Sequence, residues 1–188
     1  MAETKQEVLK DAEAKMAQAV THNREELASI RSGRASPTLL NRITVDYYGT
    51  QVPLNQVANV SVPEPRLLVI SPYDKNAISG IEKAIQSSDL GITPNNDGSV
   101  IRLAFPQLTE ERRKEMVKVA HVRAEEGRVA IRNVRRHAKE QLEKMKKDGS
   151  LSEDEERGAE KDLQKLTDRF VHEVDENLKR KEQELTEV

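Results

Sequence analysis

The sequence predicts an α+β protein: an antiparallel three-helix bundle with a small β/α/β domain inserted between its first and second helices. Apolar residues recur every three or four positions over residues 5–31, over residues 109–147 and again after Ser152, which is the spacing of one face of a helix. Between the first two stretches lies a segment of short alternating strands. Three amphipathic helices that cannot bury their apolar faces alone favour a bundle, and the strands favour a separate domain.

Composition limits the kinds of protein that this chain can be. Charged residues make up 34% of the 188 residues and hydrophobic residues 36%, which indicates a polar surface around a thin core. Aromatic residues make up only 3%, so stacking platforms for single-stranded nucleic acid are nearly absent. The chain has no cysteine, no apolar signal core at its start and no apolar run of membrane-spanning length. We therefore expect a soluble protein of the cytoplasm.

The first helix is expected over residues 5–31. Its predicted buried face is Val8, Ala12, Met16, Ala19, Asn23, Leu27 and Ile30. Ser32–Gly33–Arg34 then interrupts the helix, because glycine loosens the backbone and a proline follows at Pro37.

The inserted domain is expected to contain short strands and one helix, and its six positive and six negative charges between Arg34 and Phe105 make it neutral. Its predicted elements are a helical turn at 38–42, a hairpin over 43–52 that turns at Gly49–Thr50, strands at 57–62, 66–70 and 100–105, and a helix from Asp74 or Asn76 to Leu90–Gly91. The 66–70 strand, which is wholly apolar after Arg66, is expected to be buried on both faces or nearly so.

The second bundle helix carries the one constellation that indicates binding. Thr109 is expected to cap it, and at 1.5 Å per residue it would be roughly 55–60 Å long. Three arginines and one lysine recur along it about a quarter-turn from the apolar face: Arg128, Arg132, Arg135 and Lys139. Arg136 lies beside this stripe. No acidic residue occurs from Gly127 to Lys139, so these arginines are expected to lack partners within the helix. Arginine forks suit phosphate oxygens, which favours an RNA or DNA backbone as the ligand.

A solvated face is the competing interpretation of this arginine stripe. The third helix, which begins with the capping-box pattern Ser152–Glu153–Asp154–Glu155, can supply carboxylates across the bundle. Residues 109–147 contain thirteen Lys and Arg against seven Asp and Glu, whereas residues 148–188 contain seven against fourteen. The two helices could therefore simply attract each other.

Catalytic and metal-binding patterns are weak. The four histidines (His22, His121, His137 and His172) show no metal-ligand spacing, and no glycine-rich phosphate loop precedes a helix. We expect no enzyme activity, no metal, no cofactor and no small-molecule substrate.

Several long blocks of the sequence resemble the bacterial ribosome recycling factor family, in order and over essentially the whole chain. They are Arg31–Pro37, Tyr47–Gly49, Pro53–Leu54, Glu82–Ile85, Ser88–Gly91, Leu108–Lys114, Arg128–Arg136 and Gln164–Asp168. One departure is Pro106–Gln107, where the resemblance leads us to expect two prolines.

The resemblance implies an L-shaped two-domain monomer of tRNA-like dimensions, which binds the 70S ribosome after termination and contacts 23S rRNA of the large subunit. Elongation factor G, with GTP hydrolysis on that partner, would then drive subunit splitting. The family's rRNA-contacting arginines match Arg31, Arg113, Arg132 and Arg135, and the stripe adds Arg128 and Arg136 by pattern alone.

The resulting division of the chain assigns residues 1–32 and 106–188 to the rRNA-binding bundle and residues 33–105 to the inserted domain. Two chain crossings, Ser32–Gly33–Arg34 and Phe105–Pro106–Gln107, would form a hinge between them. Two other classes stay open on pattern alone: a helical adaptor that binds proteins through its bundle, and an RNA chaperone without a defined target.

Overall fold

The structure, a computed structural model, describes residues 4–187 of the chain. The chain forms two compact units, of which one comprises the chain up to Ser32 and from Glu110 onward, and the other comprises Gly33–Thr109. The first unit is helical, and the second holds all strands of the described part of the chain, so the predicted α+β class is confirmed. Residues 1–3 and 188, which the sequence assigned to the bundle, lie outside the described residues.

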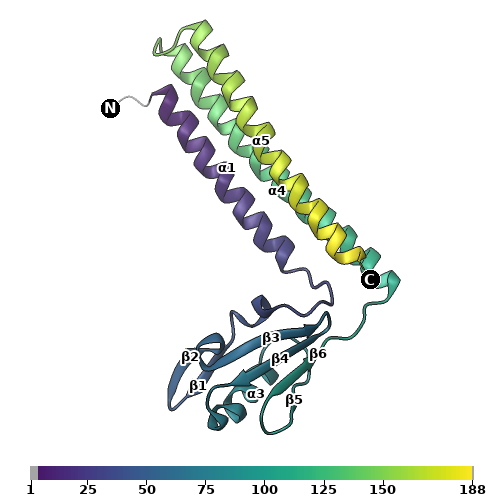
Figure 1. Cartoon of the computed structure of the whole chain (residues 1–188). Helices are drawn as coiled ribbons and strands as arrows, with labels where there is room; N and C mark the ends of the chain where they lie inside the picture. The colour runs from purple at the N-terminus through teal and green to yellow at the C-terminus, as the bar shows by residue number, and fades with distance from the viewer. Residues whose placement is uncertain (1–3, 188) are drawn as a thin grey trace. The chain divides into compact units, whose positions relative to one another are not determined.

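Three helices form the first unit: α1 (Lys5–Ala28), α4 (Glu110–Lys147) and α5 (Glu153–Thr186). Figure 1 shows α4 running antiparallel to α1 and to α5, as predicted. Their apolar faces meet in one core that runs along the bundle. Its fully buried large side chains are Met16, Ile131, Leu142, Leu163 and Leu185.

The ends of the helices follow the local sequence. Thr4 and Ser152 each form a capping box, with Glu7 and Glu155 respectively, so the predicted box at Ser152 is confirmed. The first helix ends at Ala28, earlier than the predicted residue 31. There the Ser29 hydroxyl donates a hydrogen bond to the carbonyl of Glu26 at 2.6 Å and competes with continuation of the helix.

The second unit contains two antiparallel sheets and one regular helix. Its elements are 3₁₀ turns at Pro37–Leu40 and Lys75–Ala77, strands β1 (Thr44–Tyr47), β2 (Thr50–Pro53), β3 (Ala58–Glu64), β4 (Leu67–Pro72), β5 (Asn95–Asn96) and β6 (Ile101–Ala104), and helices α2 (Leu54–Val57) and α3 (Ile78–Gln86). β1 pairs with β2, and the larger sheet has the order β3-β4-β6-β5. A second core forms between α3 and the strands and includes Val45, Leu68, Ile70, Ile81 and Leu103.

Three details of this unit differ from the sequence predictions. The hairpin turns at Tyr48–Gly49, one residue earlier than predicted, because both residues take the positive φ (49° and 81°) that a tight two-residue turn requires. Along β4 burial alternates: Leu68 and Ile70 are buried, while Leu67 and Val69 are only half-buried. The short elements α2 and β5 were not predicted.

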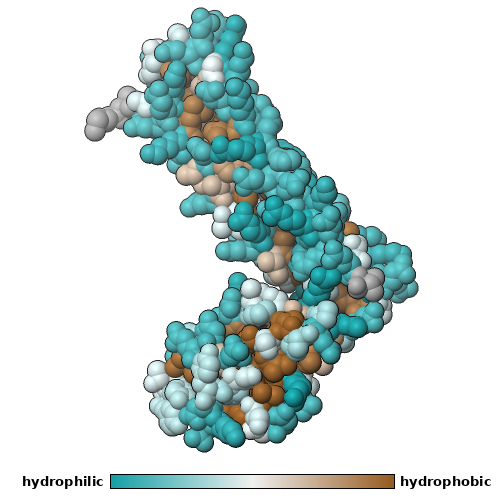
Figure 2. Space-filling view, in the orientation of Figure 1, coloured by the Kyte–Doolittle hydropathy of each residue, from teal (hydrophilic) through white to brown (hydrophobic). Residues whose placement is uncertain are grey.

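The surfaces of the two units differ in polarity. Figure 2 shows a largely hydrophilic bundle exterior with hydrophobic residues visible between helices, and a larger hydrophobic area on the visible face of the other unit. None of the helices, as far as the structure describes them, is long and apolar enough to cross a membrane.

Candidate nucleic-acid interface

The predicted arginine stripe lies on the middle turns of α4, which is helical without interruption from Glu110 to Lys147. Arg132 and Lys139 have side chains that are 50% and 47% exposed, and Arg136 is exposed too. The helical period brings these side chains to neighbouring turns. The stripe is therefore a continuous cationic surface rather than scattered charges.

Arg128 is held more tightly than the rest of the stripe. Its side chain is only 21% exposed, and its guanidinium donates to Asp175 of α5 (Nε to Oδ1, 2.8 Å) and to Glu125 (3.0 Å). Partial burial alone would lower the pKa of Arg128, but its hydrogen bonds to Asp175 and Glu125 outweigh the burial and raise that pKa. Arg128 thus links α4 to α5.

The expectation that these arginines lack partners within their helix is wrong for two of them. Glu125 lies just before the acid-free segment and accepts hydrogen bonds from Arg128 and from Arg132, the latter at 3.1 Å. The hydrogen bond from Arg128, together with that from Arg132, lowers the pKa of Glu125. The sequence holds the signal, because Glu125 precedes Arg128 by three residues and Arg132 by seven.

Beyond Arg132 the stripe has weaker pairing. The Arg135 guanidinium donates to Oε1 of Gln164, a neutral partner on α5, at 3.2 Å. The Lys139 ammonium lies 4.0 Å from carboxylates of Glu143 and Glu160, at the limit of an ion pair. Arg136 makes no hydrogen bond or ion pair with any residue between 4 and 187. Positive charge is therefore left available along this part of α4.

The two remaining predicted arginines lie at the end of the bundle where α1 ends and α4 begins. Arg31 follows α1 and is exposed, while Arg113 lies in the first turn of α4 and is half-buried; both are engaged in contacts. Nineteen residues separate Arg113 from Arg132, which corresponds to about 28 Å along the helix. The six predicted arginines therefore do not converge on one pocket, and their spread suits a long polyanion.

The histidines of α4 and α5 lie beside glutamates. His121 lies against Glu182, His137 is 3.8 Å from Glu140, and His172 is 4.0 Å from Glu176. Among residues 4–187, no three His, Asp or Glu side chains group in a way that could hold a metal ion.

By architecture and charge, the molecule is an α+β protein whose helical bundle carries a cationic stripe on α4, an arrangement suited to a structured polyanion. Residues 23–186 match the family described as "Ribosome recycling factor". The ribosome-recycling factor of Shouchella clausii is 57% identical over 182 residues, covering 97% of this chain and 98% of the relative, and that of Bacillus subtilis is 54% identical with the same coverage. The chain belongs to the ribosome recycling factor family.

Solved structures agree with this assignment. A solution structure of the ribosome recycling factor matches with a TM-score of 0.84 at 42% identity, covering 100% of both chains. A second structure matches with a TM-score of 0.67 at 46% identity and covers 98% of this chain and 100% of the other. It is described as models for the T. thermophilus ribosome recycling factor and the E. coli elongation factor G bound to the E. coli post-termination complex.

Proposed function

We propose that this protein binds the post-termination ribosome and, together with elongation factor G, splits it into subunits and releases them from mRNA and tRNA. The observation that best supports this proposal is the near-complete match to ribosome recycling factors, which spans both compact units. A related structure described with elongation factor G on a post-termination complex supports the choice of partners. Action on ribosomes assigns the protein to the cytoplasm.

The cationic surface of the bundle is the proposed contact with 23S rRNA of the large subunit. Arg132, Arg135 and Arg136 would neutralise backbone phosphates from the middle of α4, while Arg31 and Arg113 would do so from the end of the bundle where α1 ends and α4 begins. Since the Arg128 guanidinium is occupied by Asp175 and Glu125, its proposed role is to fix Glu125 and thereby the orientation of Arg132.

The second unit is proposed to receive force from elongation factor G and to transmit it through the two chain crossings. Gly33 takes a φ of +76°, and a Cβ there would lie 3.0 Å from Cγ of Leu108. Position 33 in the first crossing therefore has little room for a residue with a side chain. At the other crossing, the N–H of Phe105 donates to the carbonyl of Arg66 at 2.8 Å and continues the sheet. Residues 106–109 are therefore the better candidates for hinge motion on that side.

The protein itself is proposed to be a non-catalytic factor. GTP hydrolysis on elongation factor G would supply the free energy, and the rigid bundle would convert movement of the second unit into separation of the subunits. No cofactor is needed in this mechanism, because the chain only binds and transmits force.

Two measurements test the proposal: cosedimentation with 70S ribosomes and large subunits, and polysome breakdown with elongation factor G and GTP. We expect association with both particles and breakdown that requires all three components. Arg132→Ala should weaken large-subunit affinity roughly tenfold and reduce its salt slope by about 1. Arg24→Ala, which removes an exposed arginine of α1 without a partner among residues 4–187, is the matched control. Absence of ribosome binding, with concentration-dependent self-association instead, would leave the adaptor class.

A further inference from the structure

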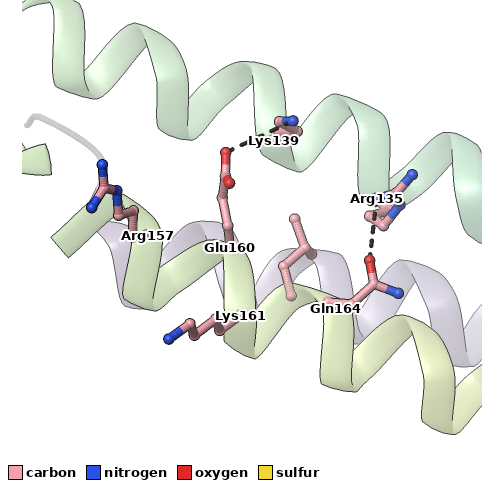
Figure 3. Close-up of a pocket in the computed structure, with 7 residues that line it drawn as sticks. Arg135, Lys139, Arg157, Glu160, Lys161 and Gln164 are labelled. Carbon is pink, nitrogen blue, oxygen red and sulfur yellow. Dashed lines mark hydrogen bonds and ion pairs between the residues drawn. The ribbon is translucent and has the colours of Figure 1, made fainter. Parts of the chain in front are cut away.

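An open groove of about 350 Å³ lies between α4 and α5, beside the arginine stripe. Arg135 and Lys139 line it from α4, and Arg157 and Lys161 line it from α5. Figure 3 shows these side chains on the two facing helices, with Glu160 and Gln164 between them. Among the described residues, Glu160 is the only carboxylate in the lining of this groove against four cationic side chains. Figure 3 shows Glu160 pointing toward Lys139, whereas the ammonium of Lys161 points away from α4.

The positive charge of the groove is only partly neutralised by its surroundings. Lys139 approaches Glu160 only to 4.0 Å, and Arg157 pairs with Glu153 on the preceding turn of α5 at 2.8 Å. Lys161 makes no hydrogen bond or ion pair within the part of the chain that the structure describes. The contacts that join α4 to α5 across the groove are Lys139–Glu160 and Arg135–Gln164, and neither involves the two α5 cations. The presence of those two cations is therefore not explained by packing. It is also unexpected on α5, where acidic residues outnumber basic ones by two to one after Lys147.

Two contacts prepare the groove for a ligand. Gln164 accepts the hydrogen bond from Arg135 and donates its own amide hydrogen to Asp168 at 2.8 Å, which fixes the orientation of the amide and so of the arginine. Leu163, which is almost fully buried, forms the apolar floor. A guanidinium held in place with N–H groups still free is suited to two-point contact with phosphate oxygens.

We infer that this groove seats a backbone phosphate of large-subunit rRNA, with Arg157 and Lys161 of α5 as binding residues beside Arg135 and Lys139. The inference rests on the proposed function and extends its contact surface from one helix to two. Arg135 belongs to both the stripe and the groove, so one continuous cationic surface would follow the RNA backbone across the α4–α5 boundary.

A charge-matched pair of double variants tests the groove. Arg157→Ala with Lys161→Ala removes its two α5 cations, and Lys179→Ala with Arg180→Ala removes one lysine and one arginine from an exposed site elsewhere on α5. Affinity for purified large subunits is measured across a salt series. The groove variant should lose roughly tenfold in affinity and at least about 1 in salt slope, whereas the control should match the wild type. Thermal unfolding confirms that both variants are folded.

The outcomes separate the groove from the proposed function. Equal losses in both double variants would mean that only net charge matters, and wild-type behaviour of the groove variant would also overturn the inference. Arg132→Ala runs in the same series: a loss there, with none in the groove variant, rejects the groove alone, and a wild-type protein without salt-dependent binding rejects the proposed function. Hydroxyl-radical footprinting of the rRNA identifies the ligand. The groove variant should lose one protected backbone stretch, and lower affinity with an unchanged footprint would instead indicate a ribosomal protein.

Discussion

At the scale of single residues, the packing of α1 against α4 includes a glycine beside an asparagine. Asn23 is 3% exposed and donates from Nδ2 to the carbonyl of Arg123 at 2.6 Å. A Cβ on Gly127 would lie 2.6 Å from Cγ and from Nδ2 of Asn23. The side chain of Asn23 thus occupies the space that Gly127 leaves open, and its hydrogen bond keeps it there.

Gly127→Ala is expected to destabilise the protein by up to about 2 kcal/mol. Alanine would gain about 1 kcal/mol from helix propensity, but overpacking against Asn23 costs about 1–3 kcal/mol. Gly158→Ala on α5 is the matched control, because nothing lies within 4 Å of the added Cβ and the protein should become more stable by up to about 1 kcal/mol. Urea unfolding measures both free energies.

A double-mutant cycle identifies the cause of the Gly127 effect. Asn23→Ala alone should cost about 1 kcal/mol, mainly for the lost hydrogen bond to Arg123. In that background Gly127→Ala should stabilise the protein by up to about 1 kcal/mol, because the clash has gone and the gain in helix propensity remains. A full penalty in the double variant would show that backbone strain, and not Asn23, disfavours alanine.

Alanine substitutions of two arginines in the stripe are expected to change different properties, one the stability of the protein and the other its affinity for the large subunit. Arg128→Ala should cost about 1–2 kcal/mol in unfolding free energy, because the half-buried guanidinium joins Asp175 to Glu125. Arg132→Ala, whose side chain is half exposed, should change stability by less than about 0.5 kcal/mol and act mainly on large-subunit affinity. Equal stability losses, measured by urea unfolding of both variants, would contradict this division.

The sequence predicted the stripe but not its partners. Helical periodicity fixes which residues of one helix share a face, so the positions of Arg128, Arg132 and Arg135 on α4 follow from spacing. The register between two helices depends on how their side chains interlock, which no single-helix pattern encodes. Asp175 and Gln164 therefore emerged as partners only from the structure.

At the scale of elements, the hydrogen-bonded carboxylate of Glu125 is expected to make the stability of α4 fall at acid pH. Its hydrogen bonds lower its pKa in the folded state below the unfolded value of about 4.3. The resulting stability is present above pH about 4.3 and is lost as pH falls through the folded pKa.

Glu125→Gln is expected to reduce stability at pH 7 and to flatten part of the fall in stability at acid pH. Urea midpoints from pH 7 to pH 3 measure both effects. Glu25→Gln, which removes a carboxylate of α1 that pairs with no residue between 4 and 187, is the control and should leave the profile unchanged. Parallel profiles for the Glu125→Gln variant and the wild type would show that Glu125 is not a source of the acid sensitivity.

Elements with strong local sequence signals, such as a long apolar period or a capping pattern, were predicted well, and elements without them were not. The three long helices have many repeats of their apolar period, and α1 and α5 begin with capping boxes, so their existence was predictable and only the end of α1 differed. The turn of the β1–β2 hairpin was misplaced because Tyr48 takes a positive φ that a tyrosine rarely adopts. Asp74 helps to hold that tyrosine by accepting a hydrogen bond from its hydroxyl at 3.0 Å.

At the scale of the whole molecule, each unit has its own hydrophobic core, and the buried residues of one core belong to no other. Composition indicated this division, because the inserted segment is poor in charge and its hydrophobic period changes from helical to extended. The short α2 and the two-residue β5 escaped prediction, since they span fewer residues than either period needs to be recognised.

Independent cores predict that the bundle folds without the inserted unit. Figure 1 shows that α1 ends and α4 begins toward the same end of the bundle. Residues 33–109 can therefore be replaced by a Gly/Ser linker of about 15 residues, which reaches roughly 20 Å on average. The shortened protein should be helical, unfold cooperatively and keep salt-dependent affinity for the large subunit.

The same shortened protein should fail to break down polysomes with elongation factor G and GTP, because it keeps the proposed rRNA contacts and lacks the unit proposed to receive force. A version with its linker intact but Arg132→Ala added should also lose large-subunit affinity, which shows that residual binding uses the same surface. Polysome breakdown at the wild-type rate by the bundle alone would remove the inserted unit and both chain crossings from the mechanism. Binding without breakdown would locate affinity in the bundle's cations and force transmission in the unit that interrupts it.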